Sequence, residues 1–291
     1  MAGKLQYDCA KHHLSFLQAR EHYDMMAQLA KIHAWSYFQW SALAIGLFLW
    51  LLYILFTGPY RRLLGAANEA PPTALQHVYM ALGQMLYLFA FFSPLDHISD
   101  DYLFSAHMVQ HMVEVSVMVP LLLKALPDWL WSWAFQWHPF KRVFAFMTRP
   151  VVAVVVFFLV FDDFHWPVLY DLTLVNGSFH VFEHIMFFFT AVFLWWPVLS
   201  IHPELPRLTP GWRLVYLFFA FDTMMPPSIL LLSWNSPLYV PYTHAPLRLF
   251  GLSPVTDQKL GALIMFLFGV VSELPPAIAA FGQFDFGQWY E

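Results

Sequence analysis

Long apolar segments alternate with short polar ones along most of the chain. Seven of these segments are each close to the ~20 residues that a helix needs to cross about 30 Å of hydrocarbon. They cover approximately residues 37–57, 74–93, 102–124, 151–170, 178–199, 213–234 and 258–280. Inside lipid, only helices and closed barrels satisfy their own backbone groups, and barrel strands are about 10 residues long and alternate in polarity. The pattern therefore predicts an all-α polytopic membrane protein with seven transmembrane helices.

The two ends of the chain differ from this apolar region. Residues 1–35 are polar, and apolar side chains recur at helical spacing between positions 14 and 33, which predicts an amphipathic helix on the membrane surface. Residues 36–281 hold the seven spans, and residues 282–291 form a short C-terminal tail. The N-terminus lacks the short basic region, apolar core and cleavage site of a signal peptide, so we expect the first span to be retained.

Basic residues predict the orientation. The loops after spans one, three and five hold most of those outside the N-terminal segment, whereas the opposite loops hold two. The first group is Arg61, Arg62, Lys124, Lys141, Arg142, Arg149, Arg207 and Arg213, and the second is Arg248 and Lys259. Cytoplasmic loops carry an excess of Lys and Arg, which puts the N-terminus outside and the C-terminus in the cytoplasm. Four basic residues in the N-terminal segment oppose this assignment, but the three internal loops agree with one another.

Composition agrees with a membrane protein and limits its partners. Apolar residues make up 59% and charged residues 11% of the chain, against roughly 45–50% and 25% in soluble domains. Basic residues are too few and too scattered for a nucleic-acid surface. Cys9 is the only cysteine, so an intrachain disulfide and a thiolate-rich metal site are both excluded. A metal in this protein must therefore use His, Met or carboxylate ligands.

Two histidine pairs mark a candidate site. His107 and His111 stand four residues apart in the third span, so both rings lie on one helix face, which Glu114 continues. His180 and His184 repeat this spacing in the fifth span. Both spans run inward from the outer side, so the two pairs lie at similar depth. Ionisable side chains at membrane depth are costly and usually functional. We predict a metal site made by these histidines, with two further ones near its mouth, His97 and His165.

The nature of the metal follows from ligand softness. Neutral imidazole suits copper, zinc and iron, and thioether sulfur shifts the preference toward Cu(I). Met108, Met112 and Met186 flank the histidine pairs, although methionine is also an ordinary filler of helix interfaces. Two rings about one helical turn apart suit a compact ion better than two haem groups. Copper is therefore the expected metal, ahead of iron or haem.

Two carboxylates keep an alternative open. Glu114 and Glu183 each stand three residues beyond a histidine, an arrangement that mirrors the Glu-x-x-His pattern of di-iron bundles. A membrane di-iron or copper oxidoreductase is therefore a second hypothesis. A structural subunit of a respiratory complex, with no metal, is a third. Further along, Asp222 precedes Met-Met-Pro-Pro, which predicts a kinked sixth span.

Several blocks of the sequence resemble one protein family. They are L-D-H-I-S-D-D-Y-L-F-S-A-H-M-V-Q-H-M, H-W-P-V-L-Y-D, H-V-F-E-H, F-L-W-W-P-V-L and D-Q-K-L-G-A-L-I-M. Together these blocks are similar to the CtaG family of Bacillus-type, seven-helix cytochrome c oxidase assembly factors. The matching positions are Asp96, His97, His107, Gln110, His111, His165, His180, His184, Asp257 and Gln258. The last block departs from the pattern at Lys259 and Phe266, and the long N-terminal segment is not part of it.

The resemblance implies an assembly factor of the bacterial inner membrane that is associated with copper supply to the terminal oxidase. We therefore expect a non-enzymatic protein that accepts copper on the outer side and passes it to an oxidase subunit. Its other partner is the lipid bilayer, and a homo-oligomer is compatible with this interpretation. Because copper binds neutral histidines, its retention is expected to weaken as the pH falls through ~6.5.

Overall fold

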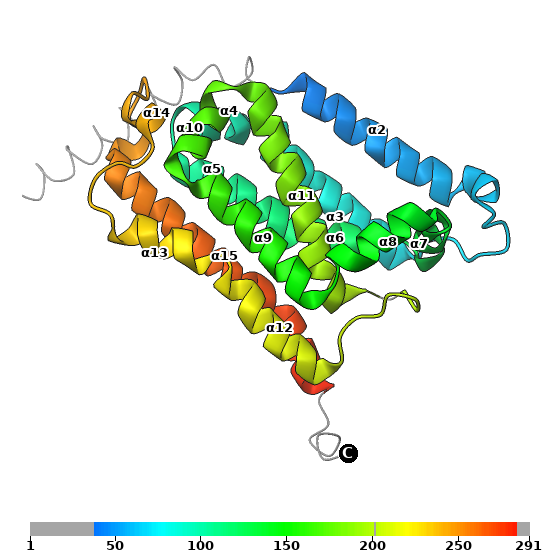
Figure 1. Cartoon of the computed structure of the whole chain (residues 1–291). Helices are drawn as coiled ribbons and strands as arrows, with labels where there is room; N and C mark the ends of the chain where they lie inside the picture. The colour runs from blue at the N-terminus through cyan, green and yellow to red at the C-terminus, as the bar shows by residue number, and fades with distance from the viewer. Residues whose placement is uncertain (1–37, 201, 284–291) are drawn as a thin grey trace, which may run out of the picture.

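The computed structural model describes residues 38–200 and 202–283. Within these residues every regular element is a helix and there is no strand, so the all-α prediction is confirmed (Figure 1). The predicted surface helix at positions 14–33 and the end of the C-terminal tail lie outside the described residues.

Five helical stretches are long and apolar enough to cross a membrane. They are Trp40–Thr57 (α2), Phe104–Ala125 (α5 to α6), Gly177–Leu199 (α11), Pro210–Ser233 (α12 and α13) and Pro254–Gly282 (α15). Two bent helix pairs are further candidate spans. These are Ala74–Phe91 (α3) with Pro94–Asp101 (α4), bent by 44°, and His138–Met147 (α8) with Pro150–His165 (α9), bent by 78°. The described residues thus contain five to seven spans, as expected for a polytopic membrane protein.

Short elements connect the spans. They are η2 (Pro59–Leu64), α7 (Asp128–Phe135), α10 (Pro167–Val175), α14 (Val240–Thr243) and η4 (Leu249–Gly251). Figure 1 shows α4, α10 and α14 at one end of the bundle and α7 and α8 toward the other. The first end is the one that the basic residues predict to face outward, and we call it the outer end.

Proline explains both bends. Pro94 and Pro150 each occupy the first turn of the second helix of a pair. A proline disfavours helical geometry at the preceding residue, and accordingly Ser93 and Arg149 are extended, with ψ of 170° and 132°. The predicted kink in the sixth span is also present, because α12 (Pro210–Asp222) ends at Asp222 and α13 (Met225–Ser233) begins three residues later.

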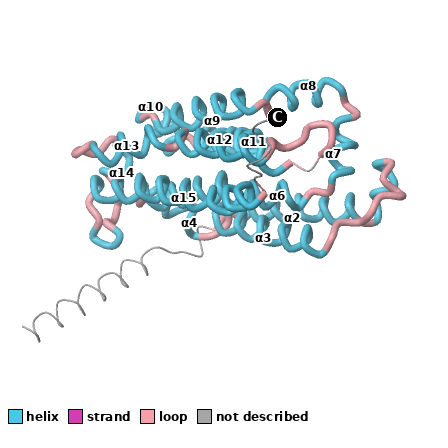
Figure 2. Tube along the Cα trace, turned by 90° about the horizontal axis from the view of Figure 1, so that it is seen from below, coloured by secondary structure: helices cyan, strands magenta, loops and turns pink. Residues whose placement is uncertain are grey.

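The bundle core lies between α5, α9, α11 and α15. α5 packs against α15, and α11 packs against α9. α2 runs along one edge beside α3, and α12 and α13 run along the opposite edge beside α15 (Figures 1 and 2). The close approach of α15 to α5 depends on Gly261, where a Cβ atom would lie 2.4 Å from the ring of Phe104. Large side chains, including Phe157, Phe161 and Phe187, fill the space between these helices and are fully buried.

A π-helical turn interrupts the third span, which consists of α5 (Phe104–Val113), Glu114–Met118 and α6 (Val119–Ala125). In this wider turn each carbonyl pairs with the N–H five residues later, but the residue five after Val115 is Pro120, which has no N–H. The indole Nε1 of Trp195 donates to the Val115 carbonyl instead, at 2.7 Å. A side chain of α11 therefore completes the backbone bonding of the third span, directly after Glu114.

Candidate metal centre

The structure brings the two histidine pairs together inside the bundle. α5 carries His107 and His111, which are fully buried, and α11 carries His180 and His184, which are 9% and 8% exposed. Within each pair the Nε2 atoms face one another, at 2.7 Å on α5 and 2.9 Å on α11. Between the pairs, the ring centroids of His107 and His180 are 5.2 Å apart, and those of His111 and His184 are 5.0 Å apart.

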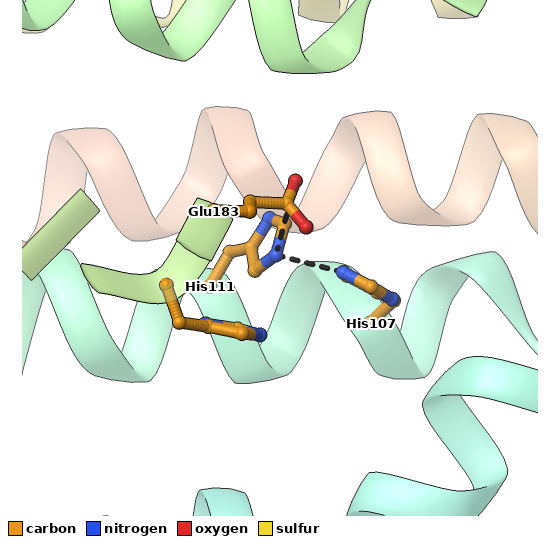
Figure 3. Close-up of side chains that lie close together, drawn as sticks. His107, His111 and Glu183 are labelled. Carbon is orange, nitrogen blue, oxygen red and sulfur yellow. Dashed lines mark hydrogen bonds and ion pairs between the residues drawn. The ribbon is translucent and has the colours of Figure 1, made fainter. Parts of the chain in front are cut away.

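Glu183 completes an inner set of four candidate ligands. One donor atom each from His107, His111, Glu183 and His184 lies within 4.8 Å of the others, and all four residues are buried. Glu183 Oε1 is 3.8 Å from the His111 Nε2 atom, which also faces His107 (Figure 3). No described residue meets hydrogen-bond geometry with either oxygen of Glu183, and the Thr173 hydroxyl, which lies near this carboxyl group, donates to the Tyr170 carbonyl. A buried carboxylate without a partner is costly, and a cation between it and the imidazoles would compensate that cost.

Glu114 supports this inner set from behind. Its Oε2 atom is 2.7 Å from His184 Nδ1, and the carboxyl group is nearly fully buried. When the Nδ1–H of His184 donates to this carboxylate, the lone pair of the ring stays on Nε2, the atom that faces the other histidines. A carboxylate behind a ligating histidine fixes the tautomer and orientation of the ring in metal sites.

Asp100 contributes an outer set of candidate ligands. Its Oδ1 is 3.8 Å from His107 Nδ1 and its Oδ2 is 3.5 Å from His180 Nδ1. One donor atom from each of these three residues lies within 4.8 Å of the others. The side chain of Asp100 is 29% exposed, whereas that of His107 is fully buried. The outer set is therefore adjacent to the inner one and closer to solvent.

Gln110 holds α4, and with it Asp100, against α5. Its Nε2 donates to Asp96 Oδ1 at 2.8 Å and to the Ala90 carbonyl at 2.9 Å. Its Oε1 accepts a bond of 2.9 Å from the Ser99 hydroxyl. Gln110 thus links α3, α4 and α5 on the side of the site that faces Asp100.

The start of α5 is fixed by the seventh span. α5 has no side-chain cap of its own. Asp257 in the first turn of α15 accepts from the backbone N–H groups of Phe104 and Ser105, at 2.7 and 3.1 Å. Because the first N–H groups of a helix have no partner within it, this contact caps α5. Asp257 therefore acts on the histidines through the helix that carries them.

Tyr242 of α14 closes the outer side. Its hydroxyl donates to the Ser99 carbonyl at 2.6 Å and lies 3.0 Å from the Tyr170 hydroxyl and 3.5 Å from His107 Nδ1. Burial raises the pKa of Tyr242 well above its ordinary value. The phenol therefore stays neutral and takes part in the site through hydrogen bonds.

The remaining two predicted ligands lie outside both sets. His165 faces the thioether of Met108, with Nε2 3.4 Å from Sδ, and its ring centroid is 5.9 Å from that of His111. Its Nδ1 lies 2.6 Å from the Phe161 carbonyl, so the neutral ring directs a lone pair toward the sulfur. His97 pairs with Asp101, with Nδ1 2.9 Å from Oδ2.

Three residues have roles in this geometry that the sequence did not predict. Asp100 was not among the predicted ligands, and Tyr242 lies in a connection far away in sequence. For Gln110, the only signal in the sequence was its match to the family pattern. Asp100 had one usable signal, since it lies seven residues before His107, in the acidic stretch that directly precedes the predicted third span.

The donor set fits a metal ion. Three imidazoles and one carboxylate converge in the inner set, and imidazole binds copper, zinc and iron. A nitrogen-rich set beside a thioether suits a softer ion than magnesium or calcium, which prefer oxygen ligands.

Comparison with known proteins gives one match. The model of the family described as cytochrome c oxidase caa3 assembly factor (Caa3_CtaG) matches residues 51–285, which is well over half of the chain. Neither a curated protein nor a solved structure matches the chain.

Proposed function

This chain belongs to the family of cytochrome c oxidase caa3 assembly factors, and from that premise we propose that it binds copper and supplies it to the oxidase. Family membership provides the link to oxidase assembly. The copper step rests on the residues of the site.

The convergence of His107, His111 and His184 on one point, with the unpartnered carboxylate of Glu183 beside them, is the observation that supports metal binding. The neutral histidines around Glu183 provide no positive charge to balance its carboxylate. A bound cation provides that charge and uses the Nε2 lone pairs. Glu114 behind His184 gives this ring the orientation that a ligand needs.

The contact between His165 and Met108 supports copper as the metal. The lone pair on His165 Nε2 and the thioether sulfur of Met108 are both hydrogen-bond acceptors, so no hydrogen bond joins them. The two atoms nevertheless lie 3.4 Å apart. Nitrogen and thioether sulfur together favour Cu(I) over harder ions. We propose that this pair forms a soft flank of the site.

The proposed setting is the bacterial inner membrane, with copper taken up at the outer end of the bundle. A terminal oxidase subunit is the proposed recipient, and the lipid bilayer surrounds the spans. Self-association into a homo-oligomer is compatible with this setting.

The first test is the metal content of the detergent-purified full chain, measured by mass spectrometry together with a visible spectrum. We expect copper without a Soret band in the parent protein, and its loss from the His107→Ala/His111→Ala double variant. His138→Ala is the matched control, because His138 is exposed and lies on α8, far from the cluster in sequence. A parent protein that stays empty after loading with Cu(I) would overturn the copper proposal.

A second candidate function is a membrane oxidoreductase, favoured by the carboxylate of Glu183 within the ligand set. Carboxylates are common ligands in di-iron bundles. Iron in the purified protein would support this alternative. A structural subunit of a respiratory complex would instead show empty histidines and a fixed stoichiometry with its oxidase.

A further inference from the structure

Two histidines of the site face in two directions. The Nε2 atom of His107 lies 2.7 Å from His111, while its Nδ1 atom lies 3.5 Å from the Tyr242 hydroxyl and 3.8 Å from Asp100 Oδ1. His180 behaves in the same way, with Nε2 2.9 Å from His184 and Nδ1 3.5 Å from the other oxygen of Asp100. Each ring therefore belongs to the inner cluster through one nitrogen and to Asp100 through the other.

The chemistry of imidazole limits how these nitrogens are used. A neutral imidazole carries one N–H and one lone pair, so it ligates an ion through only one of its nitrogens at a time. When Nε2 of His107 binds an ion, the N–H is on Nδ1 and points toward Asp100. When Nδ1 binds the ion, the N–H is on Nε2. The ring keeps one proton in both states, and only its position changes.

We propose that Asp100, His107 and His180 form a second, outer copper position through which the ion reaches and leaves the inner set. This inference rests on the proposed function, because it assumes that the inner set binds copper. The two positions share His107, so neutral rings hold one ion at a time in one position or the other. The protein therefore binds one ion in this cluster and moves it between two places.

Exposure gives the pathway its direction. Asp100 is 29% exposed, His180 is 11% exposed at its side chain, and His107, His111 and Glu183 are fully buried. An ion arriving at the outer end thus meets the carboxylate of Asp100 first, then His180 and His107, and finally the buried inner set. Asp100 is carried by the short helix α4, which Gln110 holds in place, so the outer position is fixed before the ion arrives.

A different role for Asp100 predicts different kinetics. If the carboxylate only orients the rings of His107 and His180, its loss lowers metal affinity about 10- to 100-fold, as for other supporting carboxylates. If it forms the outer position, its loss slows uptake and release by the same factor and leaves the affinity of the inner set nearly unchanged. The two rates distinguish the roles.

The experiment measures both rates on the detergent-purified full chain. Uptake is followed as the protein removes Cu(I) from its coloured bicinchoninate complex, and release as excess bicinchoninate removes Cu(I) from loaded protein. We expect Asp100→Asn to slow both processes by about tenfold while their ratio changes by less than about threefold. Asp100→Glu keeps a carboxylate and should restore most of each rate. Asp163→Asn, an exposed acidic residue of α9, is the matched control.

Three results would count against the outer position. Unchanged rates in Asp100→Asn would remove Asp100 from the pathway, and faster release alone would make it an orienting residue. Two copper ions bound in this cluster at saturation would contradict the shared use of His107. In each of these cases the parent still binds copper and the proposed function stands, whereas a parent that binds no Cu(I) contradicts both proposals. If the Asp100→Asn protein is absent from the detergent-soluble fraction, Asp100→Ser becomes the deciding variant. Slower uptake and release with a near-parental affinity support the pathway, and faster release alone counts against it.

Discussion

Two places in this protein bury histidine among aromatic rings, and they differ in how the ring nitrogens are used. His202, 1% exposed, lies against Phe135 in the connection after α11. Its Nδ1 accepts from the backbone N–H of Glu204 at 3.2 Å, and its Nε2 is 3.1 Å from the Ser132 hydroxyl. Both nitrogens of this ring have an ordinary partner.

The cluster between α5 and α11 is the opposite case. Its Nε2 atoms face one another, the Nδ1 atom of His111 has no hydrogen-bond partner, and both oxygens of Glu183 lack one as well. Burial and aromatic surroundings are common to both places, so neither identifies a site. The two places differ in the partners of the ring nitrogens, which at His202 are ordinary polar groups and in the cluster are mostly other candidate ligands; for that reason we propose ion binding only for the cluster.

The most direct test of this difference is to make the same substitution, His to Leu, at both places. In the cluster, His111→Leu removes a proposed ligand and also an Nδ1 atom that has no hydrogen-bond partner among the described residues. We expect copper binding to be lost, while the metal-free protein keeps its stability or gains up to about 1 kcal/mol. Metal analysis and thermal unfolding in detergent measure the two effects. A metal-free variant that unfolds well below the parent would show that His111 has a structural role.

His202→Leu should give the reverse result. The substitution removes the hydrogen bonds of the ring to the Ser132 hydroxyl, which still donates to the Asp128 carbonyl, and to the N–H of Glu204, so we expect a loss of about 0.5–1.5 kcal/mol of stability. Copper content should stay at the parental level, because the ring lies outside both ligand sets. Thermal unfolding and metal analysis of the same preparation test this, and a drop in copper would link the two regions.

The smallest expected effect tests the identity of the ion. Glu183→Gln keeps the shape of the side chain and removes its charge. If the ion is Cu(I), the imidazoles and the thioether dominate and the affinity should fall only modestly, by about tenfold. A competition titration with bicinchoninate measures the change. Complete loss of metal would favour the oxidoreductase, in which the carboxylate is an essential ligand.

The sequence predicted the spans well because each one depends on a local apolar run. Five expected spans correspond to single helical stretches, and the other two correspond to bent pairs. The bends at Pro94 and Pro150 had a sequence signal, since a proline at the start of a helix marks a new segment. The family resemblance was confirmed by the match over residues 51–285. Orientation and domain boundaries stay predictions.

The site was predictable only in part. Helical spacing places His107 beside His111 and His180 beside His184, but it contains no information on which helices are neighbours in the bundle. The convergence of the two pairs therefore required the structure. The same holds for Tyr242, which reaches the site through a fold contact across 135 positions from His107.

The π-helical turn at Glu114–Met118 sets the angular phase of the third span. Each residue of an α-helix advances the side chains by ~100°, and a wide turn holds one residue more than the regular helix. The side chains of α5 and α6 therefore do not follow one continuous helical phase. The i, i+4 spacing that places His107 and His111 on one face does not continue across the π-helical turn. Deleting a single residue within the turn would rotate one half against the other. Glu114 opens the turn and would keep its phase with His111, so α6 would turn away from α3 and α11 although every chemical group of the site remained in the chain.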